Sequence, residues 1–133
     1  MLDLSRFKIL VVDDEPDILR FIAAVLEDNG ANVFTAENGI DALKSASIVL
    51  PDLITLDLEM PQMDGAQVFE KLRSDPELRN IPVFIISGKP ELRRLLYKRS
   101  TIPPEGYLDK PIDESSLLRN VRKILSLKMR KEK

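Results

Sequence analysis

Short apolar segments rich in Val, Ile and Leu alternate along this chain with longer segments of helical periodicity. The clearest apolar segments are 7–12, 53–58 and 83–86, and two weaker ones are 32–36 and 106–108. Continuous apolar runs of this length are typical of strands that are buried on both faces of a parallel sheet. Because the segments between them have helical periodicity, the sequence predicts an α/β fold.

Capping residues and apolar stripes define the intervening helices. The residues that suit helix boundaries are Pro16 and Gly30 for the first helix, Asn38 and Pro51 for the second, Gly65 and Pro76 for the third, and Asp113 for the start of the last. A weaker fourth helix is expected over 91–99. The side chains expected to face the core recur at helical spacing: Ile18, Leu19, Ile22, Val25 and Leu26; Ile40, Leu43, Ala46 and Leu50; Val68, Phe69 and Leu72; Leu92, Leu95 and Leu96; Leu117, Leu118, Val121, Ile124 and Leu125.

Five strands and five helices are thus predicted in alternation. Because parallel crossovers are right-handed, we expect helices on both faces of one open, doubly wound sheet of the flavodoxin-like kind, with strand order 2-1-3-4-5. A chain of 133 residues is long enough to bury a core within a single domain. We expect that domain to cover 1–127, followed by a basic C-terminal tail at 128–133.

Composition excludes several kinds of chemistry. The chain has no Cys and no His, which rules out disulfides, thiolate metal sites, imidazole bases and haem ligation. The remaining reactive groups are carboxylates, hydroxyls, lysines and any bound hard cation. The apolar runs are too short to span a bilayer, and the beginning of the chain lacks the features of a signal peptide. A net charge of -2 with only two Tyr and five Phe shows no footprint for nucleic acid. We therefore expect a cytoplasmic protein that binds neither membrane nor nucleic acid directly.

Polar residues stand where four of the predicted strands end. Asp13 and Asp14 follow the first strand, Asp57 lies at the end of the third, Ser87 follows the fourth, and Lys110 follows the fifth. In a doubly wound sheet ligands bind at the carboxyl ends of the strands, where the strand order reverses, and strands 1 and 3 are neighbours there. Each residue taken singly also fits a turn or a helix cap. Their common placement predicts one site.

The side chains of this expected site suit phosphoryl transfer. Three carboxylates close together repel one another, and a divalent cation such as Mg²⁺ cancels that repulsion, with a backbone carbonyl just after Asp57 as a further ligand. The hydroxyl of Ser87 and the ammonium group of Lys110 are of the kind that holds phosphoryl oxygens. Together these groups favour transfer of a phosphoryl group onto a carboxylate.

Five motifs in this order resemble those of the receiver domains of two-component response regulators. They are ILVVDDE (9–15), LDLEMP (56–61), MDG (63–65), IISG (85–88) and GYLDKP (106–111). The resemblance covers about 7–125 and implies a signalling switch, not an enzyme of metabolism. It implies that the phosphoryl group comes from a phosphohistidine of a sensor histidine kinase or a phosphotransfer protein. It also implies that phosphorylation alters the face formed by the 91–99 helix, the fifth strand and the last helix, and so alters binding to a downstream target or output domain. A phosphorylation-dependent homodimer remains open.

The same resemblance implies a role for each residue of the site. The expected ligands of Mg²⁺ are Asp13, Asp14, Asp57 and the backbone carbonyl of Glu59, and the expected catalytic residues are Asp57 as phosphoacceptor, Ser87 and Lys110. Ser87 and Tyr107 are the expected switch residues, because the aromatic ring turns inward in such domains when the hydroxyl moves toward the phosphate. The Lys110–Pro111 peptide bond is expected to be cis.

The chain departs from the usual pattern of these domains in two places. Gly88 stands where Ala is common, and a stiff segment, 102–105, replaces a short Gly-Ala turn before the fifth strand. At two variable positions beside the site the chain has opposite charges, Glu59 and Lys89. We hypothesise that these two side chains pair across the mouth of the site and slow hydrolysis of the phosphorylated form.

Two other functions stay open at this point. A haloacid dehalogenase-like phosphatase uses the same residue types, but its nucleophile precedes its pair of acids, whereas Asp13 and Asp14 precede Asp57 here. A receiver-like interaction module that never takes a phosphoryl group is the second alternative. Such modules usually lack one of the residues that are all present in this chain.

Overall fold

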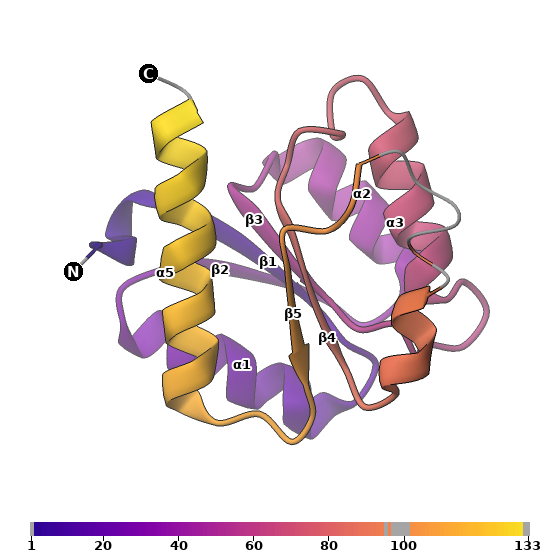
Figure 1. Cartoon of the computed structure of the whole chain (residues 1–133), viewed down its shortest axis with the longest axis horizontal. Coiled ribbons are helices and arrows are strands. Elements are labelled where there is room, and N and C mark those ends of the chain that lie inside the picture. Colours follow the sequence, from indigo (N-terminus) through magenta and orange to yellow (C-terminus); the bar gives the residue numbers. More distant parts are fainter. Residues whose placement is uncertain (1, 95, 97–101, 132–133) are drawn as a thin grey trace.

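The computed structural model describes residues 2–94, 96 and 102–131 of the chain. Five strands form one parallel sheet: β1 (Lys8–Val12), β2 (Asn32–Ala36), β3 (Leu53–Leu56), β4 (Val83–Ser87) and β5 (Gly106–Asp109). Their order is β2-β1-β3-β4-β5, which confirms the predicted doubly wound topology (Figure 1). All strands run in the same direction, and the strand order reverses between β1 and β3, where Val12 is paired with Leu56.

The third strand is shorter than the apolar run predicted. β3 ends at Leu56, although the run continues to Leu58. The N–H of Asp57 still donates to the carbonyl of Val12 at 3.0 Å, but the N–H of Glu59 donates to the carboxylate of Asp57 at 3.2 Å. This local hydrogen bond replaces a bond to a neighbouring strand, so the backbone turns out of the sheet directly after Asp57.

The α-helices are α1 (Pro16–Asp28), α2 (Gly39–Val49), α3 (Gly65–Ser74) and α5 (Glu114–Lys131), with short 3₁₀ helices η1 (Leu4–Arg6) and η2 (Pro90–Leu92). The predicted boundaries of the first two are confirmed: α1 starts at Pro16 and is followed by Gly30 with a φ of 97°, and Asn38 accepts the N–H of Asp41 at the start of α2. Among the described residues, none of these helices carries an apolar stretch that would reach across a bilayer.

Two other predicted helix ends differ or cannot be followed. The expected helix 91–99 begins instead with η2, followed by helical residues 93–94, and 95 and 97–99 lie outside the described part of the chain. The last helix continues to Lys131, so 128–131 of the expected basic tail are helical. The Lys110–Pro111 peptide bond is cis, as expected.

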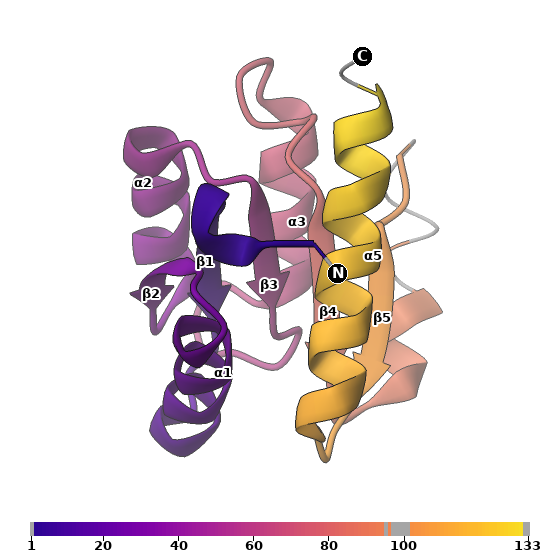
Figure 2. The ribbon, with the colours of Figure 1, turned by 90° about the vertical axis from the view of Figure 1, so that its left-hand side faces the viewer.

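The sheet is covered on both faces by helices (Figures 1 and 2). On one face α1 and α5 pack against side chains such as Ile9, Val11 and Phe84, and on the other α2 and α3 pack against Leu10, Leu56 and Ile85. The predicted apolar stripes of α1, α3 and α5 are buried in these two cores, with Ile18 and Leu118 partly buried. The predominantly apolar strands β1, β3 and β4 therefore contribute side chains to both cores.

The predicted buried face of α2 is wrong in part. Ile40 and Leu50 are 49% and 48% exposed, whereas Ala42 and Ala46 are buried. A Cβ added to Gly39 would lie 2.8 Å from Cγ2 of Val68 on α3. Because the two helices approach this closely, small side chains face inward and the bulky ones are turned outward.

Candidate functional site

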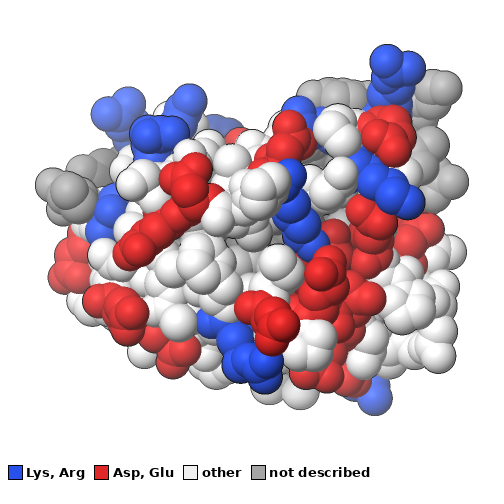
Figure 3. Space-filling view, turned by 90° about the horizontal axis from the view of Figure 1, so that it is seen from below, with Lys and Arg blue, Asp and Glu red and all other residues white. Residues whose placement is uncertain are grey.

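The polar residues predicted at the strand ends come together at the carboxyl edge of the sheet. Asp13 follows β1, Asp57 follows β3, Ser87 ends β4 and Lys110 follows β5. Backbone hydrogen bonds extend the sheet pairing by one residue here, from Asp13 to Ala36, from Asp57 to Val12 and from Lys110 to Ser87, at 3.2, 3.0 and 2.9 Å. Backbone pairing between the strands thus fixes the backbone positions from which these side chains extend. Figure 3 looks onto this end of the molecule and shows acidic side chains gathered on it.

The ammonium group of Lys110 lies among three carboxylates. Its Nζ is 3.1 Å from Oδ2 of Asp13, 3.2 Å from Oε1 of Glu15 and 3.5 Å from Oδ1 of Asp57. Asp13 and Asp57 are each only 1% exposed, and Ser87 is equally buried. A single cation therefore offsets part of a larger buried negative charge.

Four carboxylates are close enough to share one cation. Asp13, Asp14, Glu15 and Asp57 each have an oxygen within 4.8 Å of the others. Oδ2 of Asp57 is buried and accepts no hydrogen bond from any described residue. An orphaned carboxylate oxygen of this kind is costly unless a ligand satisfies it. The donor set is all oxygen, as a hard divalent cation such as Mg²⁺ prefers, so these residues fit such an ion.

The proton affinities of the site reflect its burial and its charge. Burial, followed by the charges of Asp13 and Asp14, raises the pKa of Asp57 to about 7, even though Lys110 and the N–H of Glu59 act in the opposite direction. Burial also raises the pKa of Asp13. For Lys110 burial alone lowers the pKa, but the charges of Asp57 and Asp13 outweigh it and the pKa is raised. The cluster is thus electrostatically strained in the absence of a further cation.

Gly65 is required for the close approach of α3 to Asp57. A Cβ at this position would lie 2.1 Å from the carbonyl oxygen of Asp57 and 2.6 Å from Cα of Leu58. The N–H of Gly65 donates to the carbonyl of Leu58 at 3.1 Å. Asp64 caps the helix reciprocally with Gln67, in a capping box. The start of α3 therefore packs directly against the backbone of Asp57 and Leu58 and fixes its position.

The remaining predicted residues lie around the rim. The hydroxyl of Ser87 accepts the N–H of Lys89 at 3.1 Å. Nζ of Lys89 is 3.4 Å from Oε2 of Glu59, and both side chains are largely exposed, so the hypothesised pair is present. Tyr107 is half-buried on β5, and the guanidinium of Arg93 lies 4.9 Å from the centre of its ring.

Sequence reasoning missed one contributor to this site. Glu15 was assigned no role, yet its carboxylate belongs to the acidic group and contacts Lys110. Its place directly after Asp13 and Asp14 is the signal that was available. Whether its side chain turned toward the cluster or toward solvent depended on the path of the chain into α1.

Known proteins share this fold and sequence pattern. A family model described as "Response regulator receiver domain" matches residues 9–122. Protein PilH of Pseudomonas aeruginosa is 37% identical over 120 residues, which are 90% of this chain and 98% of PilH. Response regulator PleD of Caulobacter vibrioides is 38% identical over 125 residues, which are 92% of this chain but 27% of PleD. The chain therefore spans nearly all of one relative and about a quarter of the other.

A solved structure agrees with the sequence matches. Chemotaxis protein CheY4 of Vibrio cholerae aligns with a TM-score of 0.80 at 28% sequence identity, over 88% of this chain and 97% of that protein. Receiver domains act as signalling switches, not as enzymes of metabolism, and they typically bind Mg²⁺ at an acidic pocket. The matched region, 9–122, contains every side chain of the acidic cluster described above. From the family match, the sheet order and the residues at the strand ends, we conclude that this chain belongs to the response regulator receiver domain family.

Proposed function

We propose that this chain is a phosphorylation-dependent switch whose phosphoacceptor is Asp57. The observation that carries the proposal is the buried carboxylate of Asp57, which lies 3.5 Å from Nζ of Lys110 and has one oxygen without a hydrogen bond from the described residues. A nucleophile needs a lone pair that no hydrogen bond already occupies and a nearby positive charge that stabilises the transferred group. Asp57 has both.

The proposed step moves a phosphoryl group from the imidazole nitrogen of a phosphohistidine to a carboxylate oxygen of Asp57. The P–N bond breaks, a P–O bond forms, and the nitrogen of the donor keeps the bonding electron pair. Lys110 is placed to pair with a phosphoryl oxygen, and the hydroxyl of Ser87, at the end of β4, is placed to donate to another. The donor is a sensor histidine kinase or a phosphotransfer protein.

The residues that would hold Mg²⁺ are Asp13, Asp14, Asp57 and the backbone carbonyl of Glu59. When bound, the ion supplies positive charge that offsets the oxygens of the transferred group. Asp13 already pairs with Lys110, but that single ammonium group does not offset the charges of both Asp13 and Asp14, and acids placed together destabilise a fold unless they bind something. Their proposed role is therefore to position the ion.

The proposed output of the switch is a change on the face around β5 and α5. Tyr107 lies on β5 three residues before Lys110, and Ser87 is paired with Asp109 between them in the sheet register. We expect a displacement of Ser87 toward a phosphoryl group to change the space available to the ring of Tyr107 on the neighbouring strand. We propose that the altered face binds a downstream protein or output domain, and that hydrolysis of the aspartyl phosphate within the same site ends the signal.

The experiment that tests this function is incubation with Mg²⁺ and a small acyl phosphate, followed by intact mass measurement. We expect a phosphoryl adduct that hydroxylamine removes, as an acyl phosphate should. The Asp57→Asn variant is expected to fold and to give no adduct. The Asp64→Asn variant is the matched control, because Asp64 is an exposed cap of α3 and should leave labelling intact.

Other outcomes would assign a different function. Turnover of the acyl phosphate without an adduct would favour a phosphatase, although family membership argues against a dehalogenase-like enzyme. No adduct and no turnover, in a folded protein that binds Mg²⁺, would favour the module that never takes a phosphoryl group. An adduct that persists in Asp57→Asn would place the acceptor elsewhere.

A further inference from the structure

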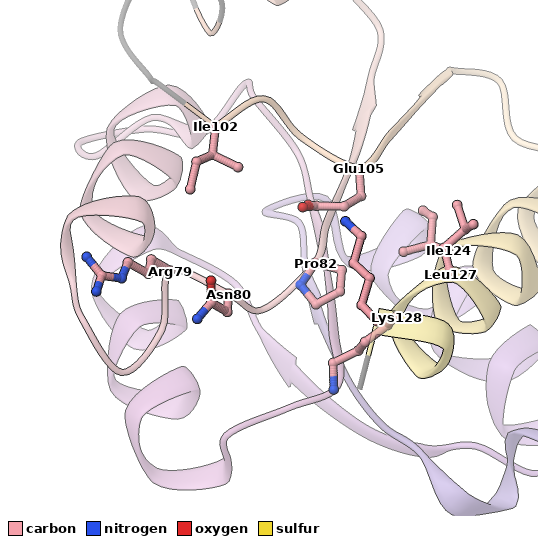
Figure 4. Close-up of a pocket in the computed structure, with 9 residues that line it drawn as sticks. Arg79, Asn80, Pro82, Ile102, Glu105, Ile124, Leu127 and Lys128 are labelled. Atoms are coloured by element: carbon pink, nitrogen blue, oxygen red, sulfur yellow. The ribbon is translucent and has the colours of Figure 1, made fainter. Parts of the chain in front are cut away.

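A groove lies at the amino end of the sheet, opposite the acidic cluster. It has a volume of about 580 Å³. Pro82 stands directly before β4, and Ile102 and Glu105 lie in the segment before β5. The rest of the lining comes from the loop after α3 and from the last turns of α5. Figure 4 shows Arg79 and Asn80 on one side, Leu127 and Lys128 on the other, and Pro82 between them. We call this the amino-end groove.

The floor of the amino-end groove is apolar and its rim is cationic. The apolar lining residues are Pro82, Ile102, Ile124 and Leu127, of which Ile102 and Leu127 are 39% and 46% exposed. The cationic ones are Arg79, Lys128 and Lys131. Lys128 shares its charge with Asp52, at 3.4 Å, but Arg79 and Lys131 form no ion pair with any described residue. The groove is thus locally positive on a chain of net charge -2.

One buried arginine joins two of the three segments that line the groove, the segment after α3 and the segment before β5. The side chain of Arg73, on α3, is 5% exposed. Its guanidinium donates to the carbonyls of Arg79 and Ile81 in the segment after α3, at 3.2 and 2.9 Å, and to those of Ile102 and Pro103 in the segment before β5, at 3.3 and 3.1 Å. These two segments of the lining are fixed before anything binds, which lowers the entropic cost of binding.

Among the described residues that line the groove, Glu105 is the only one with a carboxylate, and that carboxylate already has partners. Oε1 of Glu105 accepts from Arg73 at 2.7 Å and from the N–H of Val83 at 2.7 Å. Glu105 therefore does little to repel an incoming anion. The cationic groups available to pair with a bound anion are therefore those of Arg79 and Lys131, on either side of an apolar floor.

We propose that the amino-end groove binds an acidic peptide segment of a partner protein, with one apolar side chain on the floor and carboxylates at the rim. A concave apolar floor favours a peptide with an anchoring side chain over a nucleic acid, because a phosphate backbone would leave Ile102 and Leu127 unmatched. The cationic rim favours carboxylates over a neutral segment. This surface goes beyond the proposed phosphorylation function and lies at the other end of the sheet from it.

The test uses the full chain and two sets of short labelled peptides. In one set a central Leu or Phe is flanked by Asp and Glu, and in the matched set the acids are replaced by Asn and Gln. We expect acidic peptides to bind in the micromolar to millimolar range and to shift the amide NMR signals of Arg79, Asn80 and 124–131. The neutral set should bind at least about tenfold more weakly.

Variants then locate the binding surface. Leu127→Ser removes floor contact and Lys131→Glu reverses a rim charge, so each should weaken binding of the acidic peptides about tenfold or more. Lys123→Glu is the control, because Lys123 is exposed on α5 but does not line the groove. This variant should bind the acidic peptides as tightly as the parent chain does. Circular dichroism establishes that each variant is folded.

The remaining outcomes overturn the proposal. These are equal binding of both peptide sets, tighter binding of single-stranded DNA than of any peptide, shifts confined to other residues, or equal effects of Lys123→Glu and Lys131→Glu. Phosphoryl uptake is measured on the same samples. Loss of peptide binding with uptake intact would count against the groove alone, and loss of uptake with peptide binding intact would count against the phosphorylation function alone.

Discussion

Asp57 is both buried and surrounded by charged side chains, and these surroundings set the pKa of its carboxyl group. It is 1% exposed, with Asp13 and Lys110 beside it, and its pKa is raised to about 7 mainly by burial. A carboxyl group with a raised pKa binds its proton more tightly in the folded chain than in the unfolded one. Its ionisation therefore opposes folding, and the effect has a definite direction with pH.

We predict that metal-free protein loses stability as the pH rises from about 4 to about 7. In this window the unfolded chain has released the proton of Asp57 and the folded chain keeps it, so the free energy of unfolding falls with rising pH. Asp57→Asn removes this group. The variant should match the parent chain near pH 4 and exceed its free energy of unfolding by on the order of 4 kcal/mol at pH 8.

Urea unfolding in EDTA across the pH range measures this difference. Asp28→Asn is a suitable control, because Asp28 is exposed at the end of α1. A gap between parent and Asp57→Asn that stays constant with pH would show that the carboxyl of Asp57 is not the titrating group.

Glu59 and Lys89 allow a prediction about the lifetime of the phosphorylated form. Their charged ends are 3.4 Å apart but largely exposed, so the pair adds less than about 1 kcal/mol to stability. It can still obstruct water that approaches the phosphoryl group in line. The double variant Glu59→Ala/Lys89→Ala should lose its phosphoryl group faster than the parent chain, and each single variant should show much of the same gain. Loss of the phosphoryl group is followed after the donor is removed. An unchanged or slower loss in the double variant would show that the Glu59–Lys89 pair does not obstruct water.

At the scale of elements, the start of α3 positions Asp57 through a glycine. We predict that Gly65→Ala lowers the free energy of unfolding by about 1–3 kcal/mol, because its Cβ would overlap the carbonyl oxygen of Asp57. The displacement should also slow phosphoryl uptake. Gly88→Ala is the control, since its nearest neighbour would be Oε1 of Glu59 at 3.5 Å, an ordinary contact. Equal thermal stability of the two variants would contradict this account.

A second element-scale prediction concerns Arg73, which joins α3 to the segments before β4 and β5. Arg73→Ala would leave the carboxylate of Glu105 and several backbone carbonyls without their donor. We expect a loss of about 3–5 kcal/mol in the free energy of unfolding, as for other broken buried ion pairs. Lys71→Ala, at an exposed position of the same helix, should cost within about 0.5 kcal/mol. Urea denaturation compares the two, and similar losses would mean that Arg73 is not a structural link.

At the scale of the whole molecule, cation binding should appear as folding stability. If Mg²⁺ binds only the folded chain, a concentration one hundred times its dissociation constant adds about 2.7 kcal/mol. Asp13→Ala/Asp14→Ala should abolish this gain, whereas Glu27→Ala/Asp28→Ala, at exposed positions of α1, should retain it. Thermal unfolding with and without Mg²⁺ measures the effect. An equal response in both double variants would remove the acidic cluster as the binding site.

Much of the fold and site was predictable because both depend on short-range pattern and on topology. Strands buried on both faces must be continuously apolar, so β1, β3 and β4 were evident. Once their order was inferred, Asp13, Asp57 and Lys110 had to meet, because parallel strands end at one edge of the sheet. The inward face of α2 was not predictable in the same way, since Ile40 and Ala42 are both apolar and only the closeness of α3 selects the smaller one.

The sequence by itself determined the class of fold, the strand order and three of the four residues of the acidic cluster, Asp13, Asp14 and Asp57, because periodicity, caps and strand-end residues are local properties of the chain. Only the tertiary structure decided that Glu15 joins the cluster and that Arg73 is buried between two loops. It also decided that Arg79, Leu127 and Lys131 line one groove. These are contacts between segments far apart in the chain. A short sequence segment predicts that a charged side chain is exposed, whereas its actual contacts depend on how the helices pack around the sheet.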